Sequence, residues 1–211
     1  LDFKPISRGD YPFPDWSQYE KLPIGVMQTS WGCPYSCTYC ASNSIHPQFF
    51  QREPGEVLHE IEELEKRGVK EVAFYDDALL VNFENHFNHI LEGILGMDSP
   101  LKFNLPNAIH PKLLSQKTAD MMKKANFKRI AVGYDTVSVR EHQQKKYPLH
   151  KTLGKLHITG FQKGNILVYL LIGLPGQPKK EIFEEMDKIS ELGGKIMLAW
   201  FSPIPGTEDS K

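Results

Sequence analysis

Six apolar segments, separated by stretches with helical periodicity, constrain the fold of this 211-residue chain more than any other feature. Alternating strands and helices predict an α/β fold with a parallel sheet, because a strand that runs parallel to its neighbour needs a crossover connection, usually a right-handed helical one. The expected strands are Ile24–Ser30, Lys70–Tyr75, Leu101–Leu105, Lys128–Tyr134, Ile166–Ile172 and Ile196–Phe201.

The segments between these strands carry apolar residues at intervals of three and four, which is typical of helices that cover a sheet. Ile166–Ile172 is apolar throughout and is expected to be a buried strand. The polar region from Ser138 to Lys146 is compatible with either a helix or a loop. The expected helices are Pro54–Arg67, a helix N-capped by Asn82, one around Met121–Ala125, one around Leu149–Leu156, and Ile182–Leu192 closed by Gly193.

The length of the chain limits how many strand–helix units the fold can hold. A closed barrel of eight units usually takes about 250 residues. Six units in 211 residues therefore predict a partial (β/α)6 barrel of the TIM type, with parallel strands. We expect residues 24–211 to form this barrel core and residues 1–23, which are rich in proline and aromatic residues, to be a lead-in or linker segment.

Composition and charge argue against several classes of protein. The net charge is -1 and the pI about 6.8, so there is no overall basic field for nucleic-acid binding, although a local basic patch stays open. No apolar run approaches the roughly 20 residues that a membrane span needs. The acidic, proline-rich start does not resemble a signal peptide, and the expected location is a reducing, cytoplasmic one where thiols persist.

All three cysteines of the chain, Cys33, Cys37 and Cys40, lie in one short stretch directly after the first expected strand. A disulfide framework explains this poorly, because a bond would close a tiny loop and leave one thiol over. Thiolates are soft ligands that suit iron–sulfur clusters and zinc. His46 offers an alternative Cys3His zinc site, although structural zinc sites more often use ligands from two separated turns.

The spacing Cys33-x3-Cys37-x2-Cys40, with Tyr39 before the last cysteine, resembles the signature of the radical S-adenosylmethionine (radical SAM) enzymes. The resemblance implies that the three cysteines hold a [4Fe-4S] cluster. Because such a cluster usually takes four cysteines, three leave one iron open to bind the amino and carboxylate groups of SAM. It further implies that an electron donor such as flavodoxin or ferredoxin drives cleavage of SAM to methionine and a 5'-deoxyadenosyl radical, which abstracts hydrogen from a substrate.

Within this family, Asp76-Asp77 and Pro205-Gly206-Thr207-Glu208 are similar to segments of the branch that contains cobalamin-dependent methylases and methylthiotransferases. The similarity implies methyl or methylthio transfer, on a substrate that these motifs do not identify. In that branch a segment like residues 1–23 follows a cobalamin domain, so cobalamin is expected only through a domain absent here. The rival interpretation is a non-catalytic iron–sulfur or zinc module that binds a partner and has a closed metal site.

Polar residues gather where the expected strands end, at the edge that forms the active face of parallel barrels. The resemblance implies contacts with SAM there, with Asp76 at the amino group and Asp135 at the ribose hydroxyls, where the family usually has glutamate. The full set of expected cofactor-binding residues is Tyr39, Asp76, Asp77, Asn104, Asp135, Gly173 and Ser202.

Each of these residues also has a simpler interpretation. Asp76 and Asp77 are compatible with a solvated strand end or a helix N-cap, and Asp77 alternatively faces the substrate. Gly173 is compatible with a plain turn residue, and Tyr39 with a packed aromatic side chain. The histidines, His110 among them, are assigned no catalytic role.

Overall fold

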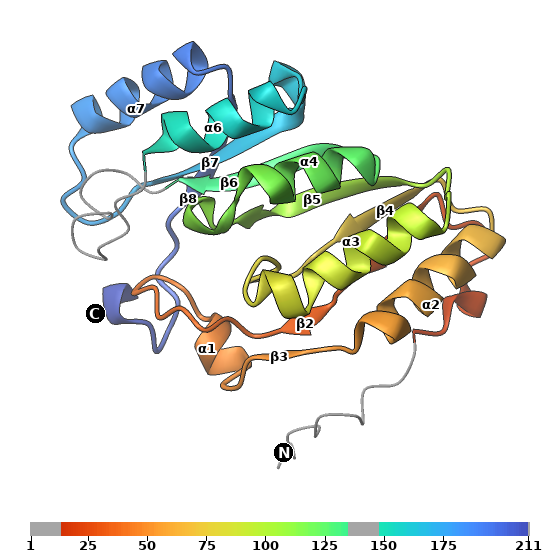
Figure 1. Ribbon diagram of the computed structural model, residues 1–211. Helices are drawn as coiled ribbons and strands as arrows, with labels where there is room; N and C mark the ends of the chain where they lie inside the picture. Colours follow the sequence, from red (N-terminus) through yellow and green to blue (C-terminus); the bar gives the residue numbers. More distant parts are fainter. Residues whose placement is uncertain (1–13, 135–147, 211) are drawn as a thin grey trace.

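The computed structural model describes residues 14–134 and 148–210, and the six expected strands form one parallel sheet in it (Figure 1). Neighbours in the chain are neighbours in the sheet, whose order is β1-β4-β5-β6-β7-β8. β1 and β8 are the two edges, so the sheet is open. The strands are β1 (Ile24–Met27), β4 (Glu71–Phe74), β5 (Lys102–Ile109), β6 (Phe127–Tyr134), β7 (Ile166–Ile172) and β8 (Lys195–Trp200).

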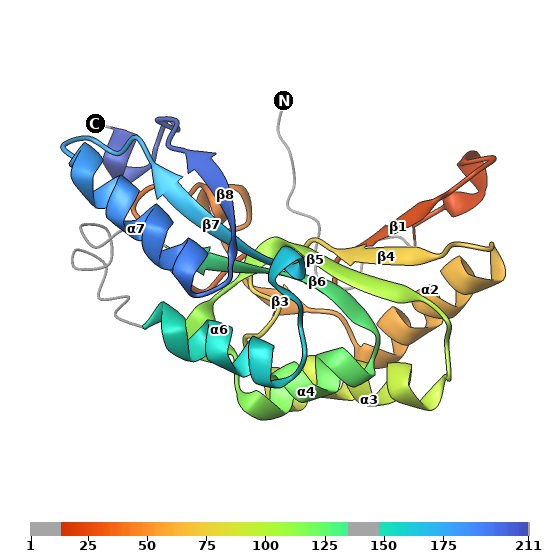
Figure 2. The ribbon, with the colours of Figure 1, turned by 90° about the horizontal axis from the view of Figure 1, so that it is seen from above.

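The long helices all lie on the same face of the sheet, as the view from above shows (Figure 2). This arrangement follows from right-handed crossovers between consecutive parallel strands. Among the described residues, no helix has both the length and the apolar content needed to cross a membrane. The covering helices are α2 (Pro54–Lys66), α3 (Phe87–Gly96), α4 (Gln116–Lys124), α6 (Leu149–Ile158) and α7 (Lys179–Glu191).

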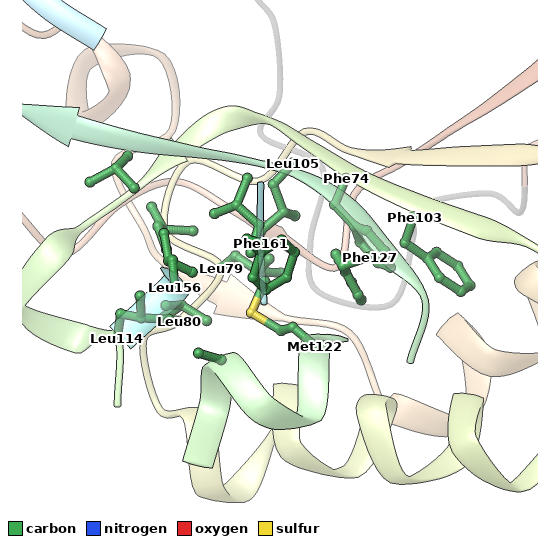
Figure 3. Close-up of a cluster of buried hydrophobic side chains, with 14 of the residues drawn as sticks. Phe74, Leu79, Leu80, Phe103, Leu105, Leu114, Met122, Phe127, Leu156 and Phe161 are labelled. Carbon is green, nitrogen blue, oxygen red and sulfur yellow. The ribbon is translucent and has the colours of Figure 1, made fainter. Parts of the chain in front are cut away.

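Four phenylalanines form the centre of the core between the sheet and its helices, and Figure 3 shows three of them, Phe74, Phe103 and Phe127. Phe74, Phe103 and Phe127 come from three adjacent strands, and their ring centroids lie 5.3 to 5.8 Å apart. Phe87 of α3 packs edge-on against Phe74 and Phe127. Each fully buried ring contributes about 1.5 to 3 kcal/mol, so this cluster holds β4, β5 and β6 to α3.

β7 is buried on one face only, which corrects the expectation of a strand buried throughout. Its residues alternate between buried and partly buried along the whole strand. The buried set faces the helices, whereas the other set faces the side of the sheet that no described helix covers. At the β8 edge even the helix-facing side is open, and Trp200 is 74% exposed.

Two further expectations on element ends need correction. The third strand was expected to end at Leu105, but β5 continues to Ile109, with an irregular register between Leu105 and Ile109. Pro106 lies in this irregular stretch, where its missing N–H breaks no regular ladder bond. Asn82 has a left-handed backbone (φ 54°) and caps no helix through its side chain; a 3-10 turn follows it, and α3 begins only at Phe87.

The described part of the lead-in segment packs against the barrel. Trp16 and Leu22 are partly buried against the core cluster. Trp16 belongs to a short 3-10 helix, η1 (Trp16–Gln18), which begins after Asp15, whose side chain accepts a hydrogen bond from the Ser17 N–H. The division at residue 23 stays a prediction.

Candidate active site at the carboxyl-terminal edge of the sheet

A cavity of about 360 Å³ lies where β1, β4, β5 and β6 end. Its lining comes from four segments of the chain, 33–42, 76–80, 107–113 and 133–134. These segments are far apart in the sequence, but parallel strands bring their carboxyl ends to one edge. The cavity therefore collects side chains from the segments in which polar residues were expected to meet.

The cysteine loop (residues 32–41) is anchored at its start by a two-stranded antiparallel ribbon that was not predicted. β2 (Ser30–Trp31) pairs with β3 (Phe50–Gln51), and the Trp31 and Phe50 rings stack with centroids 4.8 Å apart. Gly32 has φ 74°, and a Cβ there would lie 2.7 Å from the Gln48 carbonyl oxygen. Only glycine fits at this position, so the ribbon and Gly32 together direct the loop over the strand ends.

The three cysteines are thiols rather than disulfides, and all three line the cavity. Cys33 and Cys37 are half-buried, whereas Cys40 is exposed. Burial raises the pKa of the Cys33 thiol above its ordinary value. The Cys40 N–H donates to the Cys37 carbonyl at 3.0 Å, which closes a tight turn between the last two thiols. The loop thus presents three soft ligands to one cavity.

These ligands are not arranged for a single metal ion. In residues 14–134 and 148–210, no three His, Cys, Asp or Glu side chains are grouped closely enough to hold one. His46, the fourth ligand of the alternative zinc site, is not among the residues that line the cavity. A mononuclear zinc site needs all its ligands within about 2.3 Å of one point, whereas in a four-iron cluster separate thiolates bind separate irons.

Asp76 is a buried carboxylate that joins the ends of β4 and β1. Its Oδ1 accepts hydrogen bonds from the Thr29 N–H at 2.9 Å, the Thr29 hydroxyl at 2.7 Å and the Ser30 hydroxyl at 2.6 Å. Its Oδ2 is buried with no hydrogen-bond partner among the described residues. Desolvation raises the pKa of Asp76 to about 6, because its effect is larger than that of the hydrogen bonds from Thr29 and Ser30, which lower the pKa. One carboxylate oxygen thus joins the ends of the two strands, and the other is buried without a hydrogen-bond partner among the described residues.

Asp77 is exposed and contacts the cysteine loop rather than the sheet. Its Oδ2 accepts a hydrogen bond from the Ser42 hydroxyl at 3.1 Å. The same hydroxyl lies 3.3 Å from the Cys40 sulfur. Asp77 also lines the cavity, so both the solvated strand-end interpretation and the expected place in the site are compatible with its position.

The structure separates the two asparagines of β5. Asn104, an expected cofactor-binding residue, lies outside the cavity lining, and its amide donates to Glu71 Oε2 at 3.2 Å. Asn107 lines the cavity, and its amide donates to the Tyr75 carbonyl at 3.0 Å. Because β5 continues past Leu105, Asn104 sits below the edge of the sheet and Asn107 reaches it. The expected cofactor contact of Asn104 stays a prediction, for a residue outside the lining of this cavity.

Asp135, the expected ribose contact, lies outside the described residues. The two residues before it, Gly133 and Tyr134, both line the cavity at the end of β6. The Tyr134 hydroxyl donates to Glu185 Oε2 of α7 at 2.5 Å, and this contact is buried. The end of β6 is thereby held from the helix side, directly before Asp135.

The other three expected residues divide between the cavity and its surroundings. Tyr39 lines the cavity. Gly173 is exposed after β7 and outside the lining, with φ 85° and its N–H donated to Gln177 Oε1 at 2.7 Å, as in a turn. Ser202 is exposed after β8 and also outside the lining. For Gly173 the turn interpretation describes the geometry better than close approach to a ligand in this cavity.

Sequence reasoning missed one aromatic pair in the cavity. Tyr35 of the cysteine loop stacks on His110 at the end of β5, with ring centroids 4.9 Å apart and an interplanar angle of 25°. The Lys112 N–H donates to His110 Nδ1 at 3.2 Å, so a neutral ring carries its proton on Nε2. The available signal was position alone, since His110 directly follows a strand.

Comparisons with known proteins place this site in context. Residues 27–189 match the sequence profile of the Radical SAM superfamily. An uncharacterized methyltransferase of Pyrococcus horikoshii is 26% identical over 98% of this chain and 46% of its own length. The tRNA-2-methylthio-N(6)-dimethylallyladenosine synthase of Corynebacterium diphtheriae is 25% identical over 89% of this chain and 40% of its own length. The chain thus spans less than half the length of these two relatives.

Solved structures support the same architecture. The radical SAM methyltransferase TsrM of Kitasatospora setae, with cobalamin and a [4Fe-4S] cluster bound, superposes with a TM-score of 0.76 at 20% identity over 89% of this chain and 38% of its own. Coproporphyrinogen III oxidase of Escherichia coli, a radical SAM enzyme, gives 0.66 at 12% identity, covering 92% of this chain and 48% of its own. The fold is the partial barrel expected from the sequence. Because the profile match covers more than half of the chain, the chain belongs to the radical SAM superfamily of enzymes, with methyltransferase and methylthiotransferase relatives.

Proposed function

We propose that Cys33, Cys37 and Cys40 hold a [4Fe-4S] cluster whose open iron binds SAM in the cavity. The observation that carries this proposal is the convergence of three thiols on one cavity. A cluster with three protein ligands keeps one coordination position for a second ligand. The thiols also lie over the carboxyl ends of the strands, where parallel barrels place their chemistry.

Asp76 Oδ2 supports the placement of SAM. A buried oxygen without a hydrogen-bond partner costs free energy unless a ligand satisfies it. The ammonium group of SAM is a donor with the complementary charge, and a charge-assisted hydrogen bond of this kind is among the stronger ones. Because Oδ1 is held by Thr29 and Ser30, the free oxygen has a fixed position before any ligand arrives.

The remaining SAM contacts follow from position in the cavity. Tyr39 is in the lining beside the thiols and suits the adenine ring. Asp135 follows Tyr134, whose hydrogen bond to Glu185 holds the end of β6, and suits the ribose hydroxyls. Apolar residues such as Leu80 and Leu113 line the same cavity and exclude water from bound SAM.

When bound and reduced by a donor such as flavodoxin or ferredoxin, the cluster would supply the electron for cleavage of SAM to methionine and a 5'-deoxyadenosyl radical. The radical would serve hydrogen abstraction, or methyl or methylthio transfer. The protein's own contribution is binding, orientation and the exclusion of water. The relatives named as a methyltransferase and a methylthio synthase support transfer to a substrate as the reaction class.

Anaerobic reconstitution tests the proposal. Iron- and sulfide-treated protein should contain about four irons per chain, as the cluster type requires, and the electron paramagnetic resonance spectrum of its reduced form should change when SAM is added. Cys37→Ala should abolish the cluster while circular dichroism shows a folded barrel, because the core is apolar and contains no cysteine. Tightly bound zinc without a response to SAM, or a full cluster in Cys37→Ala, would refute the proposal.

A further inference from the structure

The segment after β8 returns across the carboxyl-terminal edge of the sheet to the cysteine loop. We define this segment, residues 203–210, as the closing strap. Figure 1 shows its end, near the C-terminus, beside the cysteine loop and α1 (Ser42–Ile45). The strap is internally ordered, since Thr207 is 5% exposed and both its N–H and its hydroxyl donate to the Ile204 carbonyl, at 3.1 and 2.8 Å.

Asp209 joins the strap to the cysteine loop through two hydrogen bonds to one residue. Its Oδ2 accepts from the Thr38 hydroxyl at 2.7 Å, and its N–H donates to the Thr38 carbonyl at 3.2 Å. The two residues are 171 positions apart in the chain. This contact ties the segment after the edge strand β8 to the loop that follows the opposite edge strand, β1.

Thr38 is the residue at which such a contact has most effect on the thiols. It lies between Cys37 and Cys40, inside the turn that the Cys40 N–H closes on the Cys37 carbonyl. Holding both the side chain and the carbonyl of Thr38 restricts the peptide planes of this turn. The contact therefore fixes how the second and third thiols are spaced before any cluster is present.

The contact also brings a negative charge to a segment that has none of its own. From Gly32 to Gln51 the sequence contains no Asp, Glu, Lys or Arg. The Asp209 carboxylate contacts this segment at Thr38, which is one residue after Cys37 and two residues before Cys40. A negative charge next to an iron–sulfur cluster opposes the arrival of an electron, and net charge is one of the factors that set cluster potentials.

We infer that Asp209 is a positioning residue, which holds the Cys37–Cys40 turn and lowers the reduction potential of the cluster bound there. The inference rests on the proposed function, because it requires a cluster on the three thiols. A low potential suits a cluster that must pass its electron to SAM. The closing strap, which follows the last strand of the sheet, thereby influences the reduction potential of the cluster.

Three variants separate the two effects. Asp209→Asn keeps an oxygen that accepts from Thr38 but removes the charge, whereas Asp209→Ala removes both. Glu208→Gln is the matched control, because it removes the charge of an exposed carboxylate on the same strap. Among the described residues, Glu208 makes no hydrogen bond or ion pair with the cysteine loop. Each reconstituted protein is titrated with dithionite, the electron source, and the one-electron midpoint potential is read from the reduced-cluster signal in electron paramagnetic resonance.

We expect Asp209→Asn to raise the midpoint potential at unchanged cluster content. Asp209→Ala should raise the midpoint potential as well. It should also lose the cluster to a chelator about ten to one hundred times faster, the factor that corresponds to one lost hydrogen bond to a charged group. Glu208→Gln should match the parent in both measurements. An Asp209→Asn potential equal to the parent's, or a shift of the same size in Glu208→Gln, would overturn the redox half of the inference.

Hydrogen exchange of the protein without cluster tests the positioning half independently. Protection of the Cys40 amide, which is bonded to the Cys37 carbonyl, should fall in Asp209→Ala and be retained in Asp209→Asn. Equal protection in Asp209→Ala and the parent would overturn this half. If the parent itself assembles no cluster, the proposed function fails, and the exchange measurement still decides whether Asp209 orders the turn.

Discussion

Replacing Asp76 by asparagine should stabilise the protein at neutral pH, although Asp76 makes three hydrogen bonds. The amide oxygen of asparagine can accept the same bonds from Thr29 and Ser30, so the main change is the loss of a buried charge. Desolvation is the largest influence on this carboxyl and raises its pKa from 3.8 to about 6. An ionised Asp76 is thus less favourable in the folded chain than in the unfolded one.

The size and pH dependence of the effect follow from this rise in pKa. A rise of about 2.2 pH units corresponds to about 3 kcal/mol. The folded state binds the proton more tightly, so the stability contributed by Asp76 is fully present below pH 3.8 and is lost as pH rises through about 6. The resulting cost is about 3 kcal/mol at pH 7.5 and about 2 kcal/mol at pH 5.

Urea unfolding of the protein without cluster, at several pH values, measures this cost. The free energy of unfolding of Asp76→Asn should exceed that of the parent by about 1 to 3 kcal/mol at pH 7.5. The lower figure allows for a buried amide N–H without a partner in the variant. The advantage of Asp76→Asn in the free energy of unfolding should shrink by about 1 kcal/mol on going to pH 5. Asp77→Asn, which changes an exposed carboxylate, is the control and should show neither effect. A constant difference between pH 5 and 7.5 would refute the reasoning.

The same substitution should act in the opposite direction on the cofactor. Removing the charge from Oδ2 should weaken SAM binding to the reconstituted protein by about 1 to 3 kcal/mol, the range for a charge-assisted hydrogen bond. A variant that is more stable and binds SAM less well would identify Asp76 as a residue kept for function at a cost in stability.

Three shorter predictions concern the surrounding structure. Asp135→Ala should weaken SAM affinity with the cluster intact, and Asp135→Glu should keep or improve that affinity, as measured by calorimetric titration with SAM. A loss of affinity in Asp135→Glu but not in Asp135→Ala would show that the ribose contact is assigned to the wrong residue. Tyr134→Phe should lower the free energy of unfolding by about 1 to 3 kcal/mol, because it removes a donor from the buried Glu185 carboxylate, and an unchanged urea midpoint would contradict this. Gly194→Ala should cost about 1 to 3 kcal/mol, because its Cβ would lie 2.7 Å from a buried valine of β7, whereas Gly164→Ala, with open space, should cost much less.

Much of the fold could be predicted because its signals are local. Each strand is a short apolar run bounded by a turn or a helix, and Ile166–Ile172 was located to the residue. The position of the site followed from topology, since any residue directly after a parallel strand lies at the same edge. Asp76 and the cysteines therefore could be assigned to one site without any knowledge of their distances.

The depth of a residue below that edge could not be predicted in the same way. Asn104 and Asn107 are three residues apart on β5, yet only Asn107 lines the cavity. The difference depends on how far β5 continues past Leu105 and on its irregular register near Pro106. Register is a property of two paired strands, and a single apolar run contains no information about its partner.

Contacts between segments that follow different strands depend on the arrangement of the whole sheet. The Tyr35–His110 stack needs only the loop after β1 and the end of β5, but the Thr38–Asp209 contact joins segments after the two opposite edge strands. Those segments meet only if the twist accumulated over five strand pairs bends the sheet far enough. The geometry of the cysteine turn is thus sensitive to the curvature of the whole barrel, and a substitution that flattens the sheet should disturb the second and third thiols before it affects Cys33.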